Sequence, residues 1–277
     1  MSKVATTRPV PPTAAYGMLL RQAANKPVEQ VVEQIRHLGY AVLDLKFPSE
    51  RIDLIAAEFE SLRAKYVSQF GQANLQAADE LNTIRAPLLF GSSPFLDLAL
   101  DAGLHQVLSD LILGLYILNQ QNGIINPVSQ GYNQGAWHRD LPYQHFVSSR
   151  PLAINALYCI DDFTSENGAT FVLPASHKME AFPSEAFVQN NAMQIEAKAG
   201  SFILLDCMLF HAGGFNHSSQ ERRAINHVFN IPYFKQMIHI PGNLSAPHLS
   251  DAQRSILGFR NTEAQSVLDY LKRRGLR

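Results

Sequence analysis

Residues 200–229, GSFILLDCMLFHAGGFNHSSQERRAINHVF, contain two apolar runs separated by a polar turn that is rich in glycine. His211 closes the first run, and Arg222 and Arg223 open the second. Apolar runs of this length, bounded by Gly, Asn and Ser, are typical of β-strands joined by a turn. The stretch therefore predicts antiparallel β structure, with a histidine and an arginine close to the turn.

The same pattern extends through the middle of the chain, where short apolar runs alternate with turn residues after about residue 114. The runs are LYILNQQ (115–121), LAINALYCID (152–161), TFVLPAS (170–176), MQIEAK (193–198), SFILLD (201–206), MLFHAG (208–213) and AINHVFNIPYF (224–234). Many short strands at this spacing indicate a β-sandwich or barrel. We expect a central antiparallel β core.

Helical patterns precede this core. Proline is tolerated at the first position of a helix, so Pro27 marks a start, and Gly39 marks a stop after an apolar stripe. Residues 40–47, YAVLDLKF, predict a strand. A longer amphipathic helix is expected to start at Ser49.

Further helices are expected before and after the β core in the sequence. One helical region opens at Ser93 and is interrupted near Gly103. At the C-terminal end, Thr262 and Gln265 have the spacing of a capping box ahead of an apolar helical stripe. We therefore predict helices packed against the β core, within a single domain.

This domain is expected to span residues 1–277, with a flexible tail at 1–15 and the β core at 114–235. The chain carries 23 basic and 24 acidic residues, so its net charge of −1 argues against nucleic acid or an anionic membrane as the main partner. A small-molecule substrate is the expected partner, and a homo-oligomer remains open. The sequence contains no apolar run of membrane-spanning or signal-peptide length, and we expect a cytoplasmic protein.

A candidate metal site begins with His138 and Asp140. Successive side chains of an extended segment alternate faces, so these two would point to the same side. Such a pair can also arise by chance, as a hydrogen-bonded turn or an exposed pair, and a third ligand is required. His211 is the candidate. Two histidines and one carboxylate suit Fe(II) and leave coordination positions open for a cosubstrate and dioxygen.

Three motifs follow one another along the chain: HRD (138–140), ENGATFVLPASH (166–177) and FHAGGFNHSSQERRAIN (210–226). Together they resemble the phytanoyl-CoA dioxygenase family of Fe(II)- and 2-oxoglutarate-dependent oxygenases, which includes ectoine hydroxylase. The resemblance covers roughly residues 114–235 and implies a double-stranded β-helix, the jelly roll also seen in cupins. One departure is Ala175, where the family usually has glycine in a PGSH segment.

By this resemblance His138, Asp140 and His211 are the catalytic iron ligands, and Arg222 binds the distal carboxylate of 2-oxoglutarate, because it stands eleven residues after His211. Arg223 is the rival. Strand alternation favours Arg222, which shares a face with small and polar neighbours, whereas Arg223 shares one with Ile225 and Phe229.

Other polar and aromatic side chains near these motifs are weaker candidates. Among the amides that could contact the cosubstrate we prefer Gln134, which is closest to the ligands; the others are Asn119, Gln121 and Gln130. Trp137 is expected to pack in the core, because its neighbour His138 would face the opposite way. Two interpretations are open for the residues after the HRD motif, a substrate lip or a plain surface loop; the residues are Tyr143, His145, Phe146 and Arg150.

The predicted function is hydroxylation of a small-molecule metabolite by Fe(II), 2-oxoglutarate and O2, with release of succinate and CO2. The ligand carboxylate of Asp140 is present, whereas a small residue at that position would indicate halogenation. Two alternatives remain open. One is a non-catalytic jelly roll that binds a metal or ligand, and the other is the same site performing desaturation, epoxidation or cyclisation.

Overall fold

The computed structural model describes residues 10–17, 24–91, 93–141, 146–245 and 247–276. The described strands form two antiparallel sheets. The larger sheet has the order β1 (Tyr40–Asp44), β7 (Ser201–Asp206), β4 (Ala153–Cys159), β9 (Arg222–Asn230), β3 (Ile117–Asn126) and β2 (Thr83–Arg85). The smaller sheet has the order β6 (Met193–Gln194), β5 (Phe171–Val172) and β8 (His211–Ala212). This arrangement is the predicted jelly roll with flanking helices.

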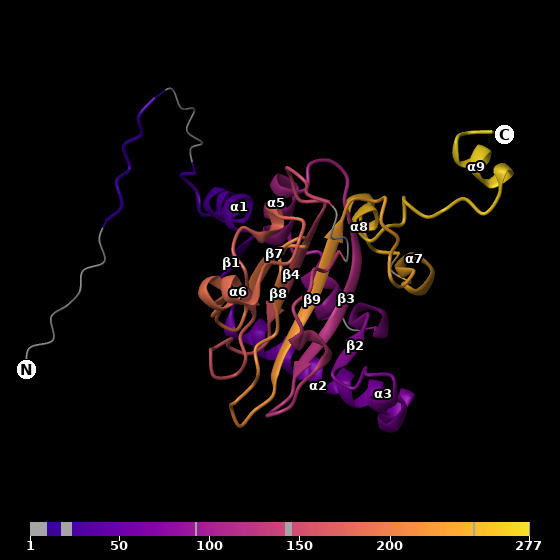
Figure 1. Cartoon of the computed structure of the whole chain (residues 1–277). Helices are drawn as coiled ribbons and strands as arrows, with labels where there is room; N and C mark the ends of the chain where they lie inside the picture. The colour runs from indigo at the N-terminus through magenta and orange to yellow at the C-terminus, as the bar shows by residue number, and fades with distance from the viewer. Residues whose placement is uncertain (1–9, 18–23, 92, 142–145, 246, 277) are drawn as a thin grey trace, which may run out of the picture.

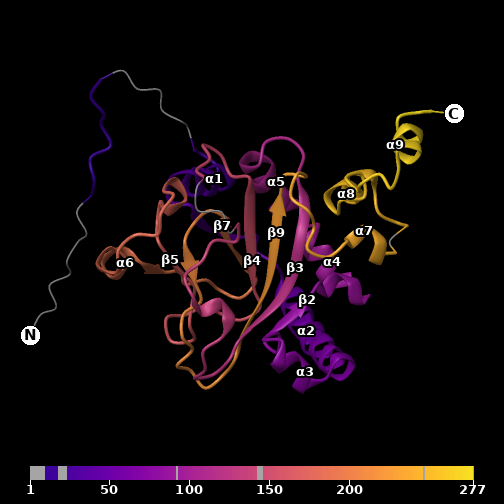
Figure 2. The ribbon, with the colours of Figure 1, turned by 45° about the vertical axis from the view of Figure 1, so that its right-hand side comes forward.

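Nine α-helices occur in the described residues, and their placement is visible in Figures 1 and 2. They are α1 (Pro27–Leu38), α2 (Ser49–Phe70), α3 (Gln72–Ala77), α4 (Ser93–Ala99), α5 (Ala102–Leu111), α6 (Glu185–Asn191), α7 (Ile240–Asn243), α8 (Asp251–Ile256) and α9 (Val267–Arg273). In both views α6 lies on one side of the sheets, and α7, α8 and α9 lie beyond the opposite side.

The larger sheet is buried on both faces. Phe202 and Leu204 of β7 belong to the core cluster that includes helices α1, α2, α4 and α5, whereas Ile203 and Leu205 belong to the cluster that includes the smaller sheet. A strand buried on both faces loses the alternation of apolar and polar residues, which explains the unbroken run SFILLD. The larger sheet thus contributes side chains to the apolar cluster on each of its two faces.

Two strands of the larger sheet come from outside the segment 114–235. β1 pairs with β7 along its whole length, and β2 pairs with β3. The N-terminal part therefore supplies edge strands as well as covering helices. The predicted strand at 40–47 is shorter in the structure and ends at Asp44, where Lys46 adopts a left-handed backbone conformation.

Several predicted boundaries hold. α1 begins at Pro27 and ends before Gly39, whose φ of 84° is the left-handed conformation that glycine tolerates. The predicted break near Gly103 is present between α4 and α5, two positions earlier at Asp101, where the Asp101 carboxylate accepts hydrogen bonds from the N–H groups of Gly103 and Leu104. Cys159 and Cys207 are free and buried.

The predicted capping box of the last helix is wrong. α9 starts at Val267, and its cap is Ser266, whose hydroxyl accepts from the Asp269 N–H at 3.0 Å. Thr262 lies in the preceding loop, where its carbonyl oxygen accepts from Arg273 at 2.7 Å. Spacing alone did not distinguish two hydroxyl residues four positions apart. Within the described residues, no helix combines the length and apolar character that crossing a bilayer requires.

A buried hydrogen-bond network joins the sheet to the helical layer. His227 on β9 donates through Nδ1 to the Ala156 carbonyl at 3.0 Å, and its Nε2 accepts from the Gln121 side chain at 2.9 Å. Gln121 also donates to Phe95 and accepts from the Leu88 N–H. All these distances are within hydrogen-bond range, so Gln121 and His227 serve the core and are not available to a cosubstrate.

Acidification should weaken this network. Burial lowers the pKa of His227 from 6.5 to about 4, so the unfolded chain takes up a proton at a higher pH than the native one. The contribution of His227 to stability is complete above pH 6.5 and is lost as the pH falls toward 4, by up to about 1.4 kcal/mol per pH unit. Urea unfolding at pH 7, 5.5 and 4.5 should show a smaller loss in His227→Gln than in wild type. Equal losses in the two proteins would contradict this assignment.

The turn before the short helix at Ser176–Lys178 holds a strained residue. Ala175 has φ of 63°, in the left-handed region that favours glycine. Ala175 is also the position where the family motif usually has glycine. The departure noted in the sequence thus falls on a backbone conformation that costs a non-glycine residue about 1 kcal/mol.

Ala175→Gly should therefore raise the free energy of unfolding by about 1 kcal/mol. Ala192→Gly is a matched control, because Ala192 has an ordinary φ of −66° and its replacement should lower stability. Denaturant unfolding of both variants at neutral pH measures the two effects. A destabilised Ala175→Gly protein would show that the left-handed turn is not strained.

Candidate metal centre

Two histidines from distant parts of the chain are paired through their backbones. The His138 N–H donates to the His211 carbonyl at 2.9 Å, and the His211 N–H donates to the His138 carbonyl at 3.1 Å. This reciprocal pattern is the hydrogen-bonded pair of an antiparallel ladder, in which both side chains project to the same side. The ring centroids are accordingly only 4.3 Å apart.

Both imidazoles have the tautomer that a metal requires. Nδ1 of His138 donates to the Ala136 carbonyl at 2.8 Å, and Nδ1 of His211 donates to the Leu209 carbonyl at 3.0 Å. In each ring Nε2 then carries the lone pair. Burial lowers the pKa of His211, which favours the neutral, ligating form. Backbone carbonyls that orient ligating imidazoles in this way are common around protein metal sites.

Asp140 completes the group. Its Oδ1 lies 3.8 Å from Nε2 of His211, and one potential ligand atom from each of His138, Asp140 and His211 lies within 4.8 Å of the others. Asn155 on β4 donates to Oδ2 at 2.8 Å, which leaves Oδ1 to face the imidazoles. These three side chains fit a divalent metal whose coordination sphere they would occupy on one face. No other such trio occurs in the described ranges.

Arg222 lies at the start of β9 and lines a cavity beside the triad of His138, Asp140 and His211. This space, the triad cavity, is also lined by His138 and His211. It is 3% exposed, and its guanidinium lies over the Phe163 ring at 3.8 Å. Nη2 approaches the Tyr132 hydroxyl at 3.3 Å, whereas Nε and Nη1 have no hydrogen-bond partner among the described residues. A buried cation with free donors is costly unless an anion joins it.

Arg223, the rival arginine, already has partners. Its guanidinium binds Asp161 at 2.6 Å and Glu60 at 2.8 Å. These carboxylates raise the pKa of Arg223 and lie on the side of the sheet away from the triad cavity, whose lining includes Arg222 and not Arg223. Strand alternation predicted this difference between the two arginines correctly.

The cavity that His138, His211 and Arg222 line has a volume of about 420 Å³, including space open to solvent. Its lining residues are Ile124, Tyr132, Gln134, His138, Asn155, Leu157, Thr170, Leu205, His211, Gly213, Arg222, Ala224 and Asn226. The side-chain oxygens of Asn155 and Asn226 are buried there without a hydrogen-bond partner in the described residues. Free polar atoms of both kinds around one cavity indicate a polar ligand.

Of the candidates Gln134, Asn119, Gln130 and Trp137, only Gln134 lines the triad cavity. Gln134 lines the cavity, with its side-chain nitrogen 3.5 Å from Oδ1 of Asn133. Asn119 donates instead to the Lys235 carbonyl at 2.6 Å, and Gln130 lines a different surface cavity. Trp137 is half-buried and packs against Phe182 at 6.0 Å, away from the triad cavity.

The proposed substrate lip is only partly described. Phe146 and Arg150 are exposed and do not line the triad cavity. Tyr143 and His145 lie outside the described residues.

Two residues of the cavity were missed in the sequence. Tyr132 contacts Arg222 from a loop six positions before His138, and burial raises the pKa of its hydroxyl, which remains protonated. Asn155 holds the Asp140 carboxylate from the middle of an apolar strand. A polar residue inside the run LAINALYCID was the available signal for Asn155, whereas nothing in the sequence distinguished Tyr132.

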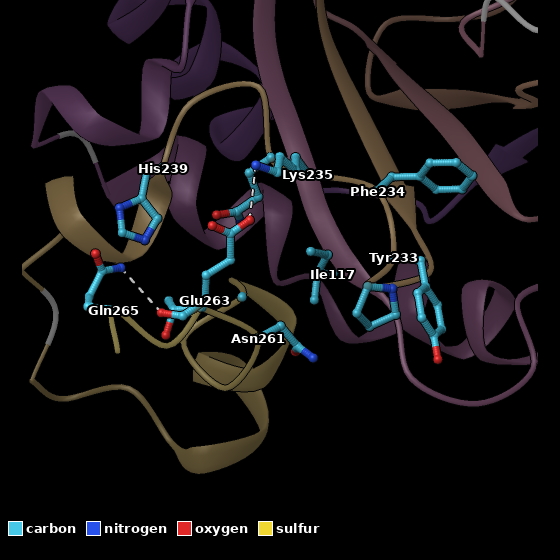
Figure 3. Close-up of a pocket in the computed structure, with 12 residues that line it drawn as sticks. Ile117, Tyr233, Phe234, Lys235, His239, Asn261, Glu263 and Gln265 are labelled. Carbon is cyan, nitrogen blue, oxygen red and sulfur yellow. Dashed lines mark hydrogen bonds and ion pairs between the residues drawn. The ribbon is translucent and has the colours of Figure 1, made fainter. Parts of the chain in front are cut away.

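A second cavity lies at the C-terminal end of the fold and is separate from the triad (Figure 3). It lies between the loop after β9 and the segment that follows α8. Lys235 and Glu263 form an ion pair of 3.0 Å across it, and Gln265 donates to the Glu263 carbonyl at 3.3 Å. Both charged side chains are largely exposed, whereas His138 and Asp140 are partly buried and His211 is buried.

Solved structures with this fold include two metal-bound proteins. EctD from S. alaskensis with bound Fe has a TM-score of 0.61 and 22% identity, covering 79% of this chain and 81% of EctD. HygX from Streptomyces hygroscopicus, with nickel, 2-oxoglutarate and hygromycin B bound, has a TM-score of 0.57 and 17% identity, covering 75% of this chain and 88% of HygX. These TM-scores show a shared fold, and at identities this low the likeness extends to the fold alone.

Sequence comparison gives the family. An uncharacterized protein of Mycobacterium tuberculosis is 29% identical over 219 residues, covering 77% of this chain and 79% of its own length. A dioxygenase of Aspergillus hancockii is 31% identical over 144 residues, covering 49% of this chain and 47% of its own length. The family model for phytanoyl-CoA dioxygenase (PhyH) matches residues 35–224. The resemblance seen in the sequence is therefore confirmed, and this protein belongs to the phytanoyl-CoA dioxygenase family.

Proposed function

We propose that this protein is a non-haem Fe(II)- and 2-oxoglutarate-dependent dioxygenase that hydroxylates a small-molecule metabolite, with release of succinate and CO2. The observation that carries the proposal is that one cavity is lined by two histidines of the His–Asp–His trio and by a buried arginine with free donors, with the carboxylate of the trio 3.8 Å from His211. The trio suits a metal, and the arginine suits a carboxylate. A dicarboxylate that bridges the two matches 2-oxoglutarate.

In this proposal each side chain has one task. His138, Asp140 and His211 hold Fe(II), and Asn155 keeps one oxygen of Asp140 turned toward the metal. Arg222 pairs with the distal carboxylate of 2-oxoglutarate. When bound, Fe(II) supplies the dioxygen chemistry that couples decarboxylation of 2-oxoglutarate to oxidation of the substrate.

Tyr132 and Gln134 would act around the cosubstrate. The Tyr132 hydroxyl lies beside Arg222 and can donate to the same carboxylate. Gln134 faces the cavity from the η2 turn (Asn133–Gly135), close to His138 in the chain. Apolar lining from Leu157, Leu205 and Ala224 would limit water around the ligand.

The comparisons support this proposal. EctD has been crystallised with Fe and with 2-oxoglutarate and 5-hydroxyectoine, and HygX with nickel, 2-oxoglutarate and hygromycin B. A relative from Aspergillus calidoustus, 34% identical over 39% of this chain, is named as an iron/alpha-ketoglutarate-dependent dioxygenase. Small ligands of this kind support a small-molecule substrate here. We further propose that the chain acts as one catalytic domain, since all three core clusters include residues of the larger sheet. The cytoplasmic location expected from the sequence is part of the same proposal.

The metal assignment is tested by Asp140→Ala. Anaerobic addition of Fe(II) and 2-oxoglutarate to the wild type should produce a weak visible charge-transfer band, and the variant should lose both this band and succinate formation, because one of three protein ligands is gone. Asp97→Ala, which removes an exposed carboxylate on α4, is the control and should retain both. Coupled succinate release by Asp140→Ala would refute the assignment.

The cosubstrate assignment is tested by the two neighbouring arginines. Arg222→Gln should weaken 2-oxoglutarate binding at least about 30-fold, the factor for ~2 kcal/mol, because a buried charge-assisted contact is lost. Arg223→Gln should leave this affinity nearly unchanged, since Arg223 already pairs with Asp161 and Glu60. Titration of the anaerobic charge-transfer band measures both. A loss confined to Arg223→Gln would reverse the assignment.

A further inference from the structure

Arg139 stands between two candidate ligands in the chain and points the other way. His138 lines the cavity and Asp140 points toward His211, whereas the Arg139 side chain is 6% exposed and lies on the other side of the His138–His211 pair. Its guanidinium donates to three backbone carbonyls of one turn: Ser176 at 3.0 Å, Glu180 at 3.1 Å, and Met179. The segment that carries two ligands is therefore attached to the turn at 176–180.

The segment that carries the third ligand is attached to the same turn. Phe210, the neighbour of His211, donates its N–H to the Ser176 hydroxyl at 2.9 Å, and its carbonyl accepts from Leu173 at 2.9 Å. The Phe210 ring lies under the Arg139 guanidinium at 3.9 Å. Ser176 thus receives a hydrogen bond from each ligand segment, through its carbonyl oxygen and its hydroxyl.

Aromatic packing closes this region. Phe182 packs edge-on against Phe210 at 4.9 Å and also contacts Trp137 at 6.0 Å. A cation enclosed by carbonyls and rings is poorly hydrated, so its hydrogen bonds are strong and their loss is costly. The planar fork of arginine reaches several acceptors at once, whereas a lysine ammonium at the same position is a compact point charge on a flexible stem.

We propose that Arg139 is a positioning residue that fixes His138 and Asp140 relative to His211 through the turn at 176–180. Arg139 has no contact with the cavity itself and acts on metal binding through the backbone of both ligand segments. This inference rests on the proposed metal centre. Ligand groups must be held within a few tenths of an ångström for tight binding. The two hydrogen bonds between His138 and His211 are the only backbone hydrogen bonds that join the ligand residues themselves in the described part of the chain, and Gly213 to Gln134 and Leu141 to Cys207 add links between the flanking residues.

The test measures metal affinity separately from stability. Metal-free wild type, Arg139→Lys and Lys178→Met are titrated with Co(II) without cosubstrate, and their urea unfolding is measured in the absence of metal. Lys178 lies in the same turn but donates outward, to the Ser148 and Ser149 carbonyls. Arg139→Lys should bind Co(II) about 10- to 100-fold more weakly and with a changed visible spectrum, as is typical when groups that orient ligands are altered. Lys178→Met should bind as the wild type does.

A second variant keeps the test possible if Arg139→Lys does not fold. Ser176→Ala removes only the hydroxyl that accepts from Phe210 and should weaken Co(II) binding several-fold. Wild-type Co(II) affinity and spectrum in Arg139→Lys, or in Ser176→Ala if Arg139→Lys does not fold, would overturn the positioning role, whatever the change in stability. Equal Co(II) affinity in wild type and Asp140→Ala would instead overturn the proposed metal centre, so the two failures are distinguishable.

Discussion

The reciprocal backbone pairing of His138 and His211 is the contact on which the site depends. It brings together two segments that lie 73 positions apart in the chain and turns both imidazoles toward one cavity. Because alternation then returns Asp140 to the same side, a single pair of hydrogen bonds organises all three candidate ligands. The tautomer of each imidazole is set within its own segment, by a carbonyl two residues earlier.

The two sheets add polar side chains around the three candidate ligands. Both faces of the larger sheet are buried, and its strands β4 and β9 present Asn155 and Arg222 to the cavity. Burial of Arg222 would be unfavourable in a purely structural role, since two of its donors lack a partner in the described residues. Phe163 and Tyr132 offset part of this cost and leave the guanidinium accessible to a carboxylate.

Much of this organisation was readable in the sequence because it depends on local periodicity. The short apolar runs predicted the strands, and Pro27 and Gly39 predicted the limits of α1. Alternation separated Arg222 from Arg223 without any knowledge of their partners. Capping signals were less reliable, because a hydroxyl or carboxylate caps whichever turn it reaches, as Ser266 and Asp101 do.

By itself, the sequence determined an antiparallel β core through its strand periodicity, and its motifs carried the resemblance that implied the jelly roll, the family and the candidates His138, Asp140, His211 and Arg222. Only the tertiary structure decided that Tyr132 lies beside Arg222 and that Gln121 and His227 are hydrogen-bonded to each other in the core. It also decided that Arg139 donates to the turn at 176–180. These contacts join positions far apart in the sequence. Their distances depend on how sheets and turns pack, which periodicity does not encode.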